Sequence, residues 1–406
     1  MNHVGISANN KPVISRGLLF LMSSAISATV ANLYYNQPLL PLIAAELGLS
    51  GDALGMIPAA SQLGYAAALL LISPLGDNIP RRRLIAILSF FLMGASLLAF
   101  SADSLLILIF SCFVIGLSAN ITQQLIPFAA SLSSAEQKGR VIGTLMTGLT
   151  IGILLSRTVS GFVGEQFGWR AVFAMSAILA LIFAVLLQLF LPPNKPANSM
   201  SYSILIGSMF TLVKQHGILR QSTFSGALWF ASFNALWVTL ALHVNEPPFG
   251  YDAQQAGMFG IIALAGVSGA KLSGLLVNRV GSRNMITIAL GLIAAGFVIS
   301  GFYGDSLAGL IAGIILIDFG VFSAQVSNQV RVFSIDPAAQ SRINGIYMLG
   351  YFLGGAFGSL AGVKVFALCG WNGVSALSLL LITLSLLVNN TFCRSKKCPS
   401  VSVTQN

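Results

Sequence analysis

Charged side chains are scarce in this chain of 406 residues. Asp, Glu, Lys and Arg make up 8% of it, against 56% hydrophobic residues. A soluble domain carries roughly 25% charged residues, because water must solvate its folded surface. The composition excludes an ordinary soluble enzyme, a nucleic-acid-binding module and a disordered chain. It is typical of a protein with many membrane spans.

Cysteine and catalytic motifs are also scarce. The four cysteines are too few and too scattered for a disulfide scaffold, and they show no zinc-like spacing. The three histidines are isolated, and no nucleophile, Walker or dinucleotide-binding motif stands in a suitable context. We therefore expect that the protein is not an enzyme and binds no metal or cofactor.

Long apolar runs dominate the chain instead. A bilayer core about 30 Å thick needs about 20 apolar residues in a helix, and a helix satisfies its own backbone hydrogen bonds in lipid. The sequence thus predicts an all-α membrane protein with twelve transmembrane helices. They fall near residues 17–43, 54–75, 84–102, 105–130, 140–163, 170–191, 221–243, 254–277, 285–303, 306–331, 343–367 and 371–391.

The distribution of charge predicts the orientation. When the N-terminus is placed inside, most of the 21 basic residues fall in inside segments and most of the 11 acidic residues fall outside. Basic residues in short loops mark the cytoplasmic side. We therefore expect both termini in the cytoplasm of a bacterium, with the first span retained as a helix in the inner membrane. The net charge of +10 then needs no nucleic acid as partner.

Two halves of the chain repeat each other at an offset of about 202 residues. The segment that begins at Asp103 matches the one that begins at Asp305, and the Gly-Trp pair at Gly168 matches the pair at Gly370. The constant offset predicts two pseudo-symmetric six-helix bundles in the same orientation. Transporters built from such parallel repeats bind their substrate between the halves, near the midplane.

We assign residues 1–191 to the N-terminal bundle and residues 221–406 to the C-terminal bundle with a short cytoplasmic tail. The polar stretch 192–220 is expected to be a cytoplasmic central loop.

The loops after the second span of each half carry a family resemblance. The first runs from Ser73 to Arg83 and keeps an acid, Asp77, before a basic cluster; the second runs from Gly274 to Arg283. Together they resemble the loop signature of the major facilitator superfamily. The end of the first span and the small residues of the fifth look like the drug:proton antiporter-like branch.

The resemblance also implies a cytoplasmic gate that locks the inner helix ends. Its candidates are Asp77, Arg81, Arg82, Arg279 and Arg283. The alternative is that these arginines only fix the topology and contact anionic lipid.

Small residues recur every four positions in spans 5 and 11. This spacing places them on one helix face, where they let backbones approach closely. The helix-packing candidates are Gly148, Gly152, Gly350, Gly354 and Gly358. The faces either pack statically or slide during alternating access.

Three charged residues fall within spans, namely Asp318, Arg157 and Lys271. A charge in hydrocarbon costs at least about 2.5–3.5 kcal/mol, so it normally faces a cavity or a partner. By depth, Asp318 could pair with either cation. The three are candidates for proton coupling, with a permanent salt bridge as the alternative for Asp318 and attraction of an anionic substrate as the alternative for Arg157.

Amides and aromatic rings gather in spans 1, 4, 7 and 10, which line the cavity in the superfamily. Helical spacing places each group on one face. The substrate-cavity candidates are Asn32, Tyr35, Asn36, Asn120, Gln123, Gln124, Phe230, Asn234, Trp237, Phe322, Gln325 and Gln329. Hydrogen bonding between helices is the alternative role.

These features predict a monomeric secondary transporter that moves a small organic solute by alternating access, with proton-coupled efflux as the favoured reaction. Its partners would be the substrate, protons and membrane lipid. Uptake of a nutrient or sugar by symport or facilitated diffusion is the alternative mechanism, and a non-transporting membrane sensor is a further alternative.

Overall fold

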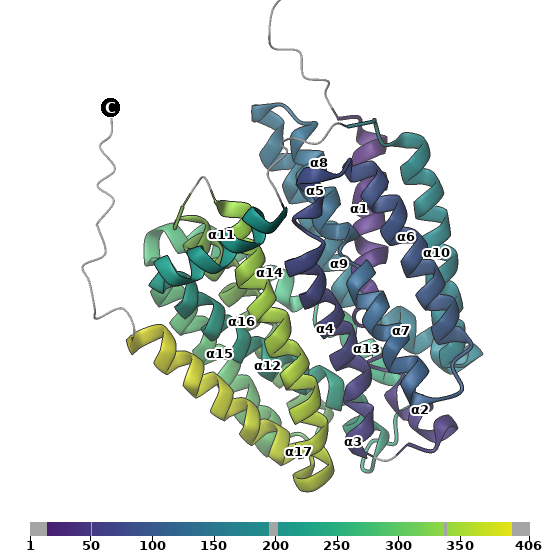
Figure 1. The fold of residues 1–406 in the computed structure, drawn as a ribbon. Helices are drawn as coiled ribbons and strands as arrows, with labels where there is room; N and C mark the ends of the chain where they lie inside the picture. Colours follow the sequence, from purple (N-terminus) through teal and green to yellow (C-terminus); the bar gives the residue numbers. More distant parts are fainter. Residues whose placement is uncertain (1–13, 50, 195–201, 337–338, 392–406) are drawn as a thin grey trace, which may run out of the picture.

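The computed structural model describes residues 14–49, 51–194, 202–336 and 339–391. Within these ranges the regular structure is helical, without strands, and most helices run side by side as a bundle (Figure 1). The predicted all-α fold class is confirmed.

The first half of the bundle comprises ten helices, and several short ones share a predicted span with the next helix. They are α1 (Arg16–Ala31), α2 (Leu40–Leu47), α3 (Gly51–Leu54), α4 (Met56–Leu71), α5 (Leu75–Asn78), α6 (Arg81–Phe100), α7 (Leu105–Ser118), α8 (Ile121–Ser131), α9 (Ala135–Phe167) and α10 (Trp169–Phe190).

The remaining helices follow the segment that joins the halves. They are α11 (Tyr202–Gln215), α12 (Gly217–Asn245), α13 (Ala253–Ile262), α14 (Ala265–Val280), α15 (Ser282–Phe302), α16 (Leu307–Phe333) and α17 (Gln340–Thr391). We call α12–α17 the second half.

The helices account for twelve passes. In the described residues, nine helical segments are long and apolar enough to cross a membrane, and α1 and α4 are shorter apolar helices. One of the nine, α17, folds back at Gly370, where φ is 62° and ψ is −160°. Glycine tolerates this positive φ because it has no Cβ. The bend therefore turns α17 into two antiparallel passes.

The first predicted span is interrupted near its middle. α1 ends at Ala31, turns occupy residues 32–39, and α2 begins at Leu40. Pro38 lacks a backbone N–H and disfavours helical geometry at Gln37, which explains the break. Irregular backbone at this depth is tolerated only when protein or water covers it, and residues 32–39 are all buried. The interruption presents polar side chains to the interior.

The central segment differs from the expected loop. It contains α11, and α12 begins at Gly217 rather than near residue 221. Leu205, Met209 and Leu212, three or four residues apart, form a buried face of α11. An apolar spacing of this kind favours a helix that packs on the bundle.

The two ends of the bundle differ in charge. Arginines and lysines stand near the starts of α6, α9, α12 and α17, and we call this the basic end. The opposite, acidic end carries Glu46, Asp103, Asp252 and Asp305. In Figure 1 the basic end is at the top, near α5, α8 and α11.

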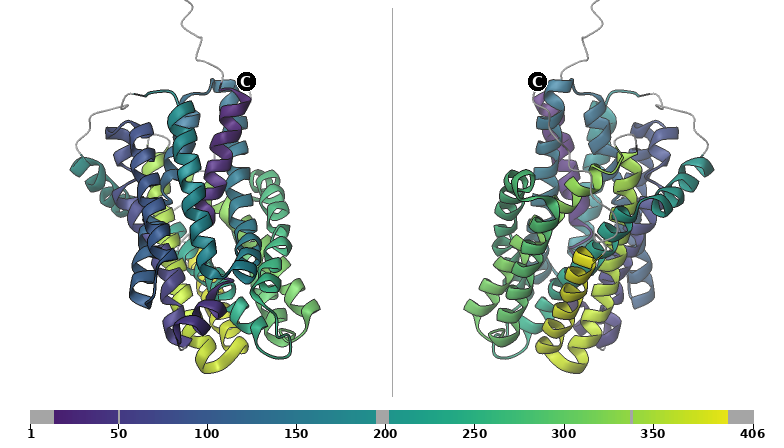
Figure 2. Two further views of the ribbon diagram at one scale, coloured as in Figure 1. Left: turned by 90° about the vertical axis from the view of Figure 1, so that its right-hand side faces the viewer. Right: turned by 90° about the vertical axis from the view of Figure 1, so that its left-hand side faces the viewer.

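The halves meet along two seams, α4 against α17 and α9 against α13. At the acidic end of the second seam, Gln166 donates to Gln254 (3.0 Å) and the backbone N–H of Ala253 donates to Glu165 (3.1 Å). Toward the basic end, α14 packs instead on α15 and α16, and the described residues show no comparable contact with α9. Figure 2 shows the bundle from its two sides. Along this seam the halves are closed at the acidic end and separate toward the basic end.

Candidate functional site

Arg157 of α9 lies in the interior, at the junction of the two halves. Only 2% of the residue is exposed. Its Nε donates to Gln37 Oε1 (2.8 Å) in the interrupted first span, and its Nη1 donates to the carbonyl of Ile153 (3.2 Å). Its Cζ lies 4.0 Å from the ring centroid of Trp237 in α12 and 5.0 Å from that of Tyr34. A buried guanidinium is stabilised by such aromatic faces, so Arg157 links the halves.

Asp318 of α16 is the second buried charge. It is 0% exposed, and both carboxylate oxygens have no hydrogen-bond partner in the described structure. Arg157 attracts it electrostatically, yet among the described residues no basic group lies within the 4.0 Å of an ion pair. An ionised carboxylate without a partner is strongly disfavoured in an apolar interior. In this structure Asp318 thus forms no salt bridge with a described residue.

Lys271, the other candidate partner, lies elsewhere. It is exposed on the outer surface of α14, which suits a long side chain that reaches toward the membrane interface. Of the two cations, Arg157 is thus the one that acts on Asp318.

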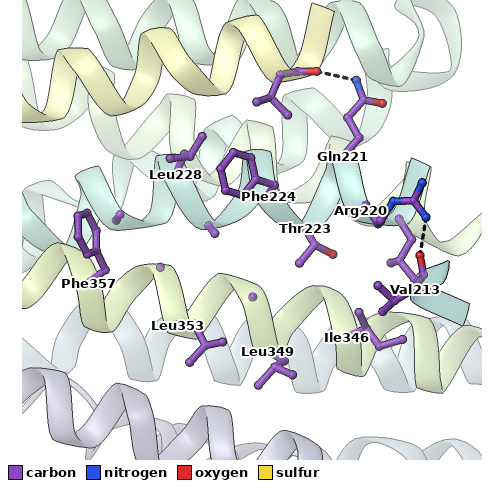
Figure 3. Close-up of a pocket in the computed structure, with 16 residues that line it drawn as sticks. Val213, Arg220, Gln221, Thr223, Phe224, Leu228, Ile346, Leu349, Leu353 and Phe357 are labelled. Atoms are coloured by element: carbon purple, nitrogen blue, oxygen red, sulfur yellow. Dashed lines mark hydrogen bonds between the residues drawn. The ribbon is translucent and has the colours of Figure 1, made fainter. Parts of the chain in front are cut away.

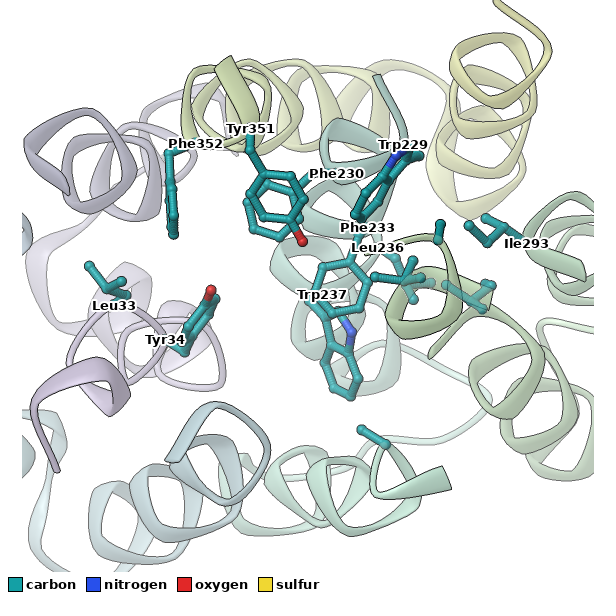
Figure 4. Close-up of a cluster of buried hydrophobic side chains, with 14 of the residues drawn as sticks. Leu33, Tyr34, Trp229, Phe230, Phe233, Leu236, Trp237, Ile293, Tyr351 and Phe352 are labelled. Carbon is teal, nitrogen blue, oxygen red and sulfur yellow. The ribbon is translucent and has the colours of Figure 1, made fainter. Parts of the chain in front are cut away.

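Aromatic rings from both halves gather in the region of Arg157 and Asp318. Phe230 of α12 stacks on Tyr351 of α17 with ring centroids 3.6 Å apart, and Tyr65 of α4 lies 4.3 Å from Phe352. Figure 4 shows Phe230, Tyr351 and Phe352, with Tyr34 of the first half and Trp237 of the second, around one central region. Offset and edge contacts of this kind stabilise a packed interface.

Amide groups connect the same region by hydrogen bonds. Gln62 of α4 donates to Asn234 of α12 across the halves (3.3 Å). Gln123 donates to the hydroxyl of Tyr65 (2.9 Å), and the hydroxyl of Tyr347 donates to Gln325 (2.7 Å). Polar groups from α4, α8, α12, α16 and α17 thus converge on the junction.

The structure brings together part of the predicted cavity set. Phe230, Asn234 and Trp237 lie at the junction of the halves, and Gln123 and Gln325 bond to tyrosines there. Phe322 is half-buried against Gly266 of α14, and Gln329 is half-buried.

The rest of the set lies inside the first half. Asn32 donates to the carbonyl of Ala28 (2.9 Å) and accepts from Ser176 of α10. Asn36 donates to Ser61 (3.1 Å), and Asn120 donates to Ser73 (2.9 Å) and accepts from Gln124 (3.0 Å). Tyr35 packs in the core of the same half. The helix ends at Ala31, so the helical spacing that placed Asn32, Tyr35 and Asn36 on one face does not continue past it.

Three arginines of the expected gate form hydrogen bonds within their own halves. Arg81 donates to the carbonyl of Gln124 (3.5 Å), Arg82 binds Gln188, and Arg283 donates to the carbonyl of Asn390 (2.6 Å). Arg279 is exposed at the end of α14. The side chain of Asp77, in α5, lies outside the described residues.

The predicted glycine ladders pack within each half. Gly148 and Gly152 lie against Ser23 and Ser27 of α1. Gly350, Gly354 and Gly358 lie against Thr223, Ala227 and Ala231 of α12. The close approach was expected, and the partner helices are now defined.

Other glycines form the seam between the halves. A Cβ on Gly257 would lie 2.6 Å from the carbonyl oxygen of Arg157, and one on Gly260 would lie 2.7 Å from that of Leu154. Thr158 also donates to the carbonyl of Gly257 (2.9 Å). The seam beside the buried arginine is therefore formed by backbone against backbone.

Sequence reasoning missed several residues at the junction, including Tyr34, Gln37, Gln62 and Tyr351. Pro38 in the middle of an apolar run could have indicated the interruption that places Gln37 beside Arg157. Gln62 is an isolated amide in its span, and polar residues in spans often have a functional role. In the part of the chain described here, no cluster of three or more His, Cys, Asp or Glu residues could hold a metal ion.

Comparison with known proteins gives the family. Residues 19–359 match the family model described as Major Facilitator Superfamily. The chain is 38% identical over 375 residues to an uncharacterized transporter, YgaY, of Escherichia coli O157:H7, covering 92% of this chain and 95% of that protein. It is 31% identical to a probable transporter, SCO4007, of Streptomyces coelicolor, covering 90% and 85% of the two chains.

A solved structure shares the fold. It is a bacterial homolog of the human lysosomal transporter Spinster in an inward-facing, occupied conformation, with a TM-score of 0.77, 13% identity, and coverage of 95% of this chain and 98% of that one. Together with the family match, the multi-pass bundle identifies this chain as a transporter that belongs to the Major Facilitator Superfamily.

Proposed function

We propose that the protein is a proton-coupled secondary transporter that exports a small organic solute across the bacterial inner membrane, as a monomer, by alternating access. The basic end would face the cytoplasm, because basic residues stay on that side of the membrane. The seam closed at the acidic end then corresponds to an inward-facing state. The halves would rock about the junction that contains Arg157 and Asp318.

The observation that carries the proposal is the unpaired Asp318 carboxyl in the interior. A carboxylate without a partner is disfavoured there, so Asp318 is expected to hold a proton in this state. Arg157 belongs to the other half, and it attracts the ionised form more strongly when it is near. A movement of α9 against α13 and α16 would change that attraction. Proton binding would thus be coupled to the exchange between states.

The surroundings favour a semi-polar organic substrate. Aromatic faces can pack on apolar rings, and amides can select hydrogen-bonding groups. Several buried polar atoms at the junction have no partner in the described structure, among them Arg157 Nη2, Gln37 Nε2 and Trp237 Nε1. Such groups are normally satisfied by hydrogen bonds, so a bound solute with acceptor atoms would suit them.

The test is substrate-induced proton movement in everted membrane vesicles that hold an acidic lumen. Compounds from a panel are added outside, and a pH-sensitive dye reports the lumen. Export by exchange predicts that an accepted compound makes the lumen less acidic. Further acidification would instead indicate symport and support the uptake mechanism.

Asp318→Asn is the decisive variant. It should reduce the proton movement to background while the folded amount and compound binding stay at the wild-type level. Asp103→Asn is the matched control, because Asp103 is an exposed carboxylate at the acidic end. Unchanged proton movement in Asp318→Asn would contradict the proposal.

A further inference from the structure

A groove of about 820 Å³ lies on the second half, apart from the junction of the halves (Figure 3). It runs between α12 and the first pass of α17, with Val388 of the second pass and Val213 of α11 at its margin. The side chains of Trp229 and Phe230 belong to the central aromatic group, whereas Phe224 and Leu228 line the groove. One helix, α12, thus separates the two sites.

The groove faces the bilayer. Phe224 is 58% exposed and Phe357 is 54% exposed, and both would contact lipid. Between these bulky walls the floor consists of small residues, including Ala227, Ala231 and Gly354. The groove is therefore apolar along its length, which suits a hydrocarbon chain rather than a polar solute.

The length of the groove matches one leaflet. From Arg220 to Ala231 on α12, and from Ile346 to Phe357 on α17, the helical rise gives about 16 Å. The hydrocarbon core of a bilayer is about 30 Å thick. The groove therefore spans about half of the core, beginning at the basic end.

Polar groups stand only at the basic end of the groove. Arg220 is exposed there, and its Nη1 donates to the carbonyls of Val213 and Lys214 (2.8 Å each). Deeper by one turn, the hydroxyl of Thr223 has no hydrogen-bond partner in the described structure. These bonds hold the Arg220 guanidinium at the mouth of the groove.

The helix beside this mouth has the features of an interfacial segment. Ile204 and Phe210 of α11 are exposed apolar residues, and Lys214 lies in its last turn. Helices with an apolar face and basic residues lie at the level of the lipid headgroups. In a bilayer, Arg220 would therefore lie at the depth of phosphate groups, and the groove at the depth of acyl chains.

We infer that this groove binds an anionic phospholipid of the cytoplasmic leaflet. One acyl chain would lie along α12 and α17, and the phosphate would bind Arg220. The choice of leaflet rests on the orientation in the proposed function, but the binding does not require transport. A basic residue near the surface favours an anionic lipid by about five-fold.

The intact protein is reconstituted with equal amounts of phosphatidylglycerol and phosphatidylcholine and then extracted in detergent. Native mass spectrometry measures which lipids it retains. The wild type should retain phosphatidylglycerol with about five-fold preference. Arg220→Gln should remove the preference, and Leu353→Trp, which fills the groove, should reduce retention of both lipids. Neither change touches the junction, so transport failure and lipid-binding failure are separable.

Two controls match these variants. Lys138→Gln removes an exposed charge at the same end of the bundle, and Phe110→Trp alters another lipid-facing side chain outside the groove. Both should retain lipid as the wild type does. The inference is overturned if the wild type shows no preference, if Arg220→Gln keeps it, or if Lys138→Gln loses it equally.

Discussion

Two arginines in the helices of this transporter differ in their contacts: one contacts residues of a single half and the other contacts both halves. Arg331, near the end of α16, donates to Asn389 (2.8 Å) and to Gln221, and Gln221 in turn donates to the carbonyl of Val388 (2.8 Å). All of these residues belong to the second half. Arg157 instead contacts residues of both halves, and its Nη2 has no hydrogen-bond partner among the described residues.

The difference separates a structural cluster from a functional one. A buried polar network that is well satisfied within one rigid body stabilises that body. A polar group that joins two bodies and remains partly unsatisfied is suited to exchange partners when they move. We therefore expect changes at Arg331 to affect the folded amount, and changes at Arg157 to affect the transport cycle.

Among the changes that test this comparison, Arg157→Gln should have the largest effect. The variant removes the charge that acts on Asp318 and the bond to Gln37. A lost charge-assisted hydrogen bond is worth about 1.5–3 kcal/mol, or about 10- to 150-fold in rate. Proton-coupled transport, measured in vesicles per folded molecule, should fall by that factor. Wild-type transport in Arg157→Gln would contradict the distinction between a functional Arg157 and a structural Arg331.

Arg331→Gln should have the reverse signature. The free energy of unfolding should fall by about 1.5–3 kcal/mol, because Asn389 and Gln221 lose a charged partner. The thermal midpoint in detergent reports this change, while transport per folded molecule should stay near wild type. A loss of transport without a loss of stability would show that this cluster also takes part in the cycle.

The glycine contacts extend the comparison to the helix seams. Gly257→Val places a side chain against the backbone of Arg157 across the halves, and overpacking of this kind costs typically about 1–3 kcal/mol. The contact between α9 and α13 at the acidic end should weaken. This can be measured as increased labelling, by an impermeant thiol reagent, of a cysteine introduced at Gln254. Gly354→Ala is the matched change at a seam within one half. It should lower stability without increasing that labelling, and equal labelling in both would contradict the distinction.

Much of this arrangement could be predicted from the sequence. The apolar runs predicted the membrane passes, and the spacing of Gly148 and Gly152 predicted a close contact between helices. Both predictions depend only on local spacing. The charge of Arg157 within a span indicated an interior position. These features require only the chain itself and the properties of a bilayer.

The contacts between halves could not be predicted in the same way. By depth alone, Asp318 could pair with either Lys271 or Arg157, and only the packing of α14 places Lys271 on the outside. Gln37 lies at the junction, whereas the predicted Asn32 lies inside the first half, because the first span unwinds between them. Spacing along a helix defines a face, but the partner of that face depends on the tertiary arrangement.

The smallest expected effect tests the amide contact between the halves. Gln62→Leu removes the 3.3 Å hydrogen bond to Asn234, which is long for its type. Such a bond contributes about 0.5–1.5 kcal/mol, and Asn234 would retain its own bond to the carbonyl of Phe230 (3.1 Å). Transport per folded molecule should therefore change by only a few-fold, with no loss of proton coupling. Asn36→Leu serves as the comparison, because Asn36 bonds to Ser61 within the first half. If Gln62→Leu abolished coupling, the amide pair would belong to the proton-coupling machinery with Arg157 and Asp318, because a bond this weak could not produce that loss through stability alone.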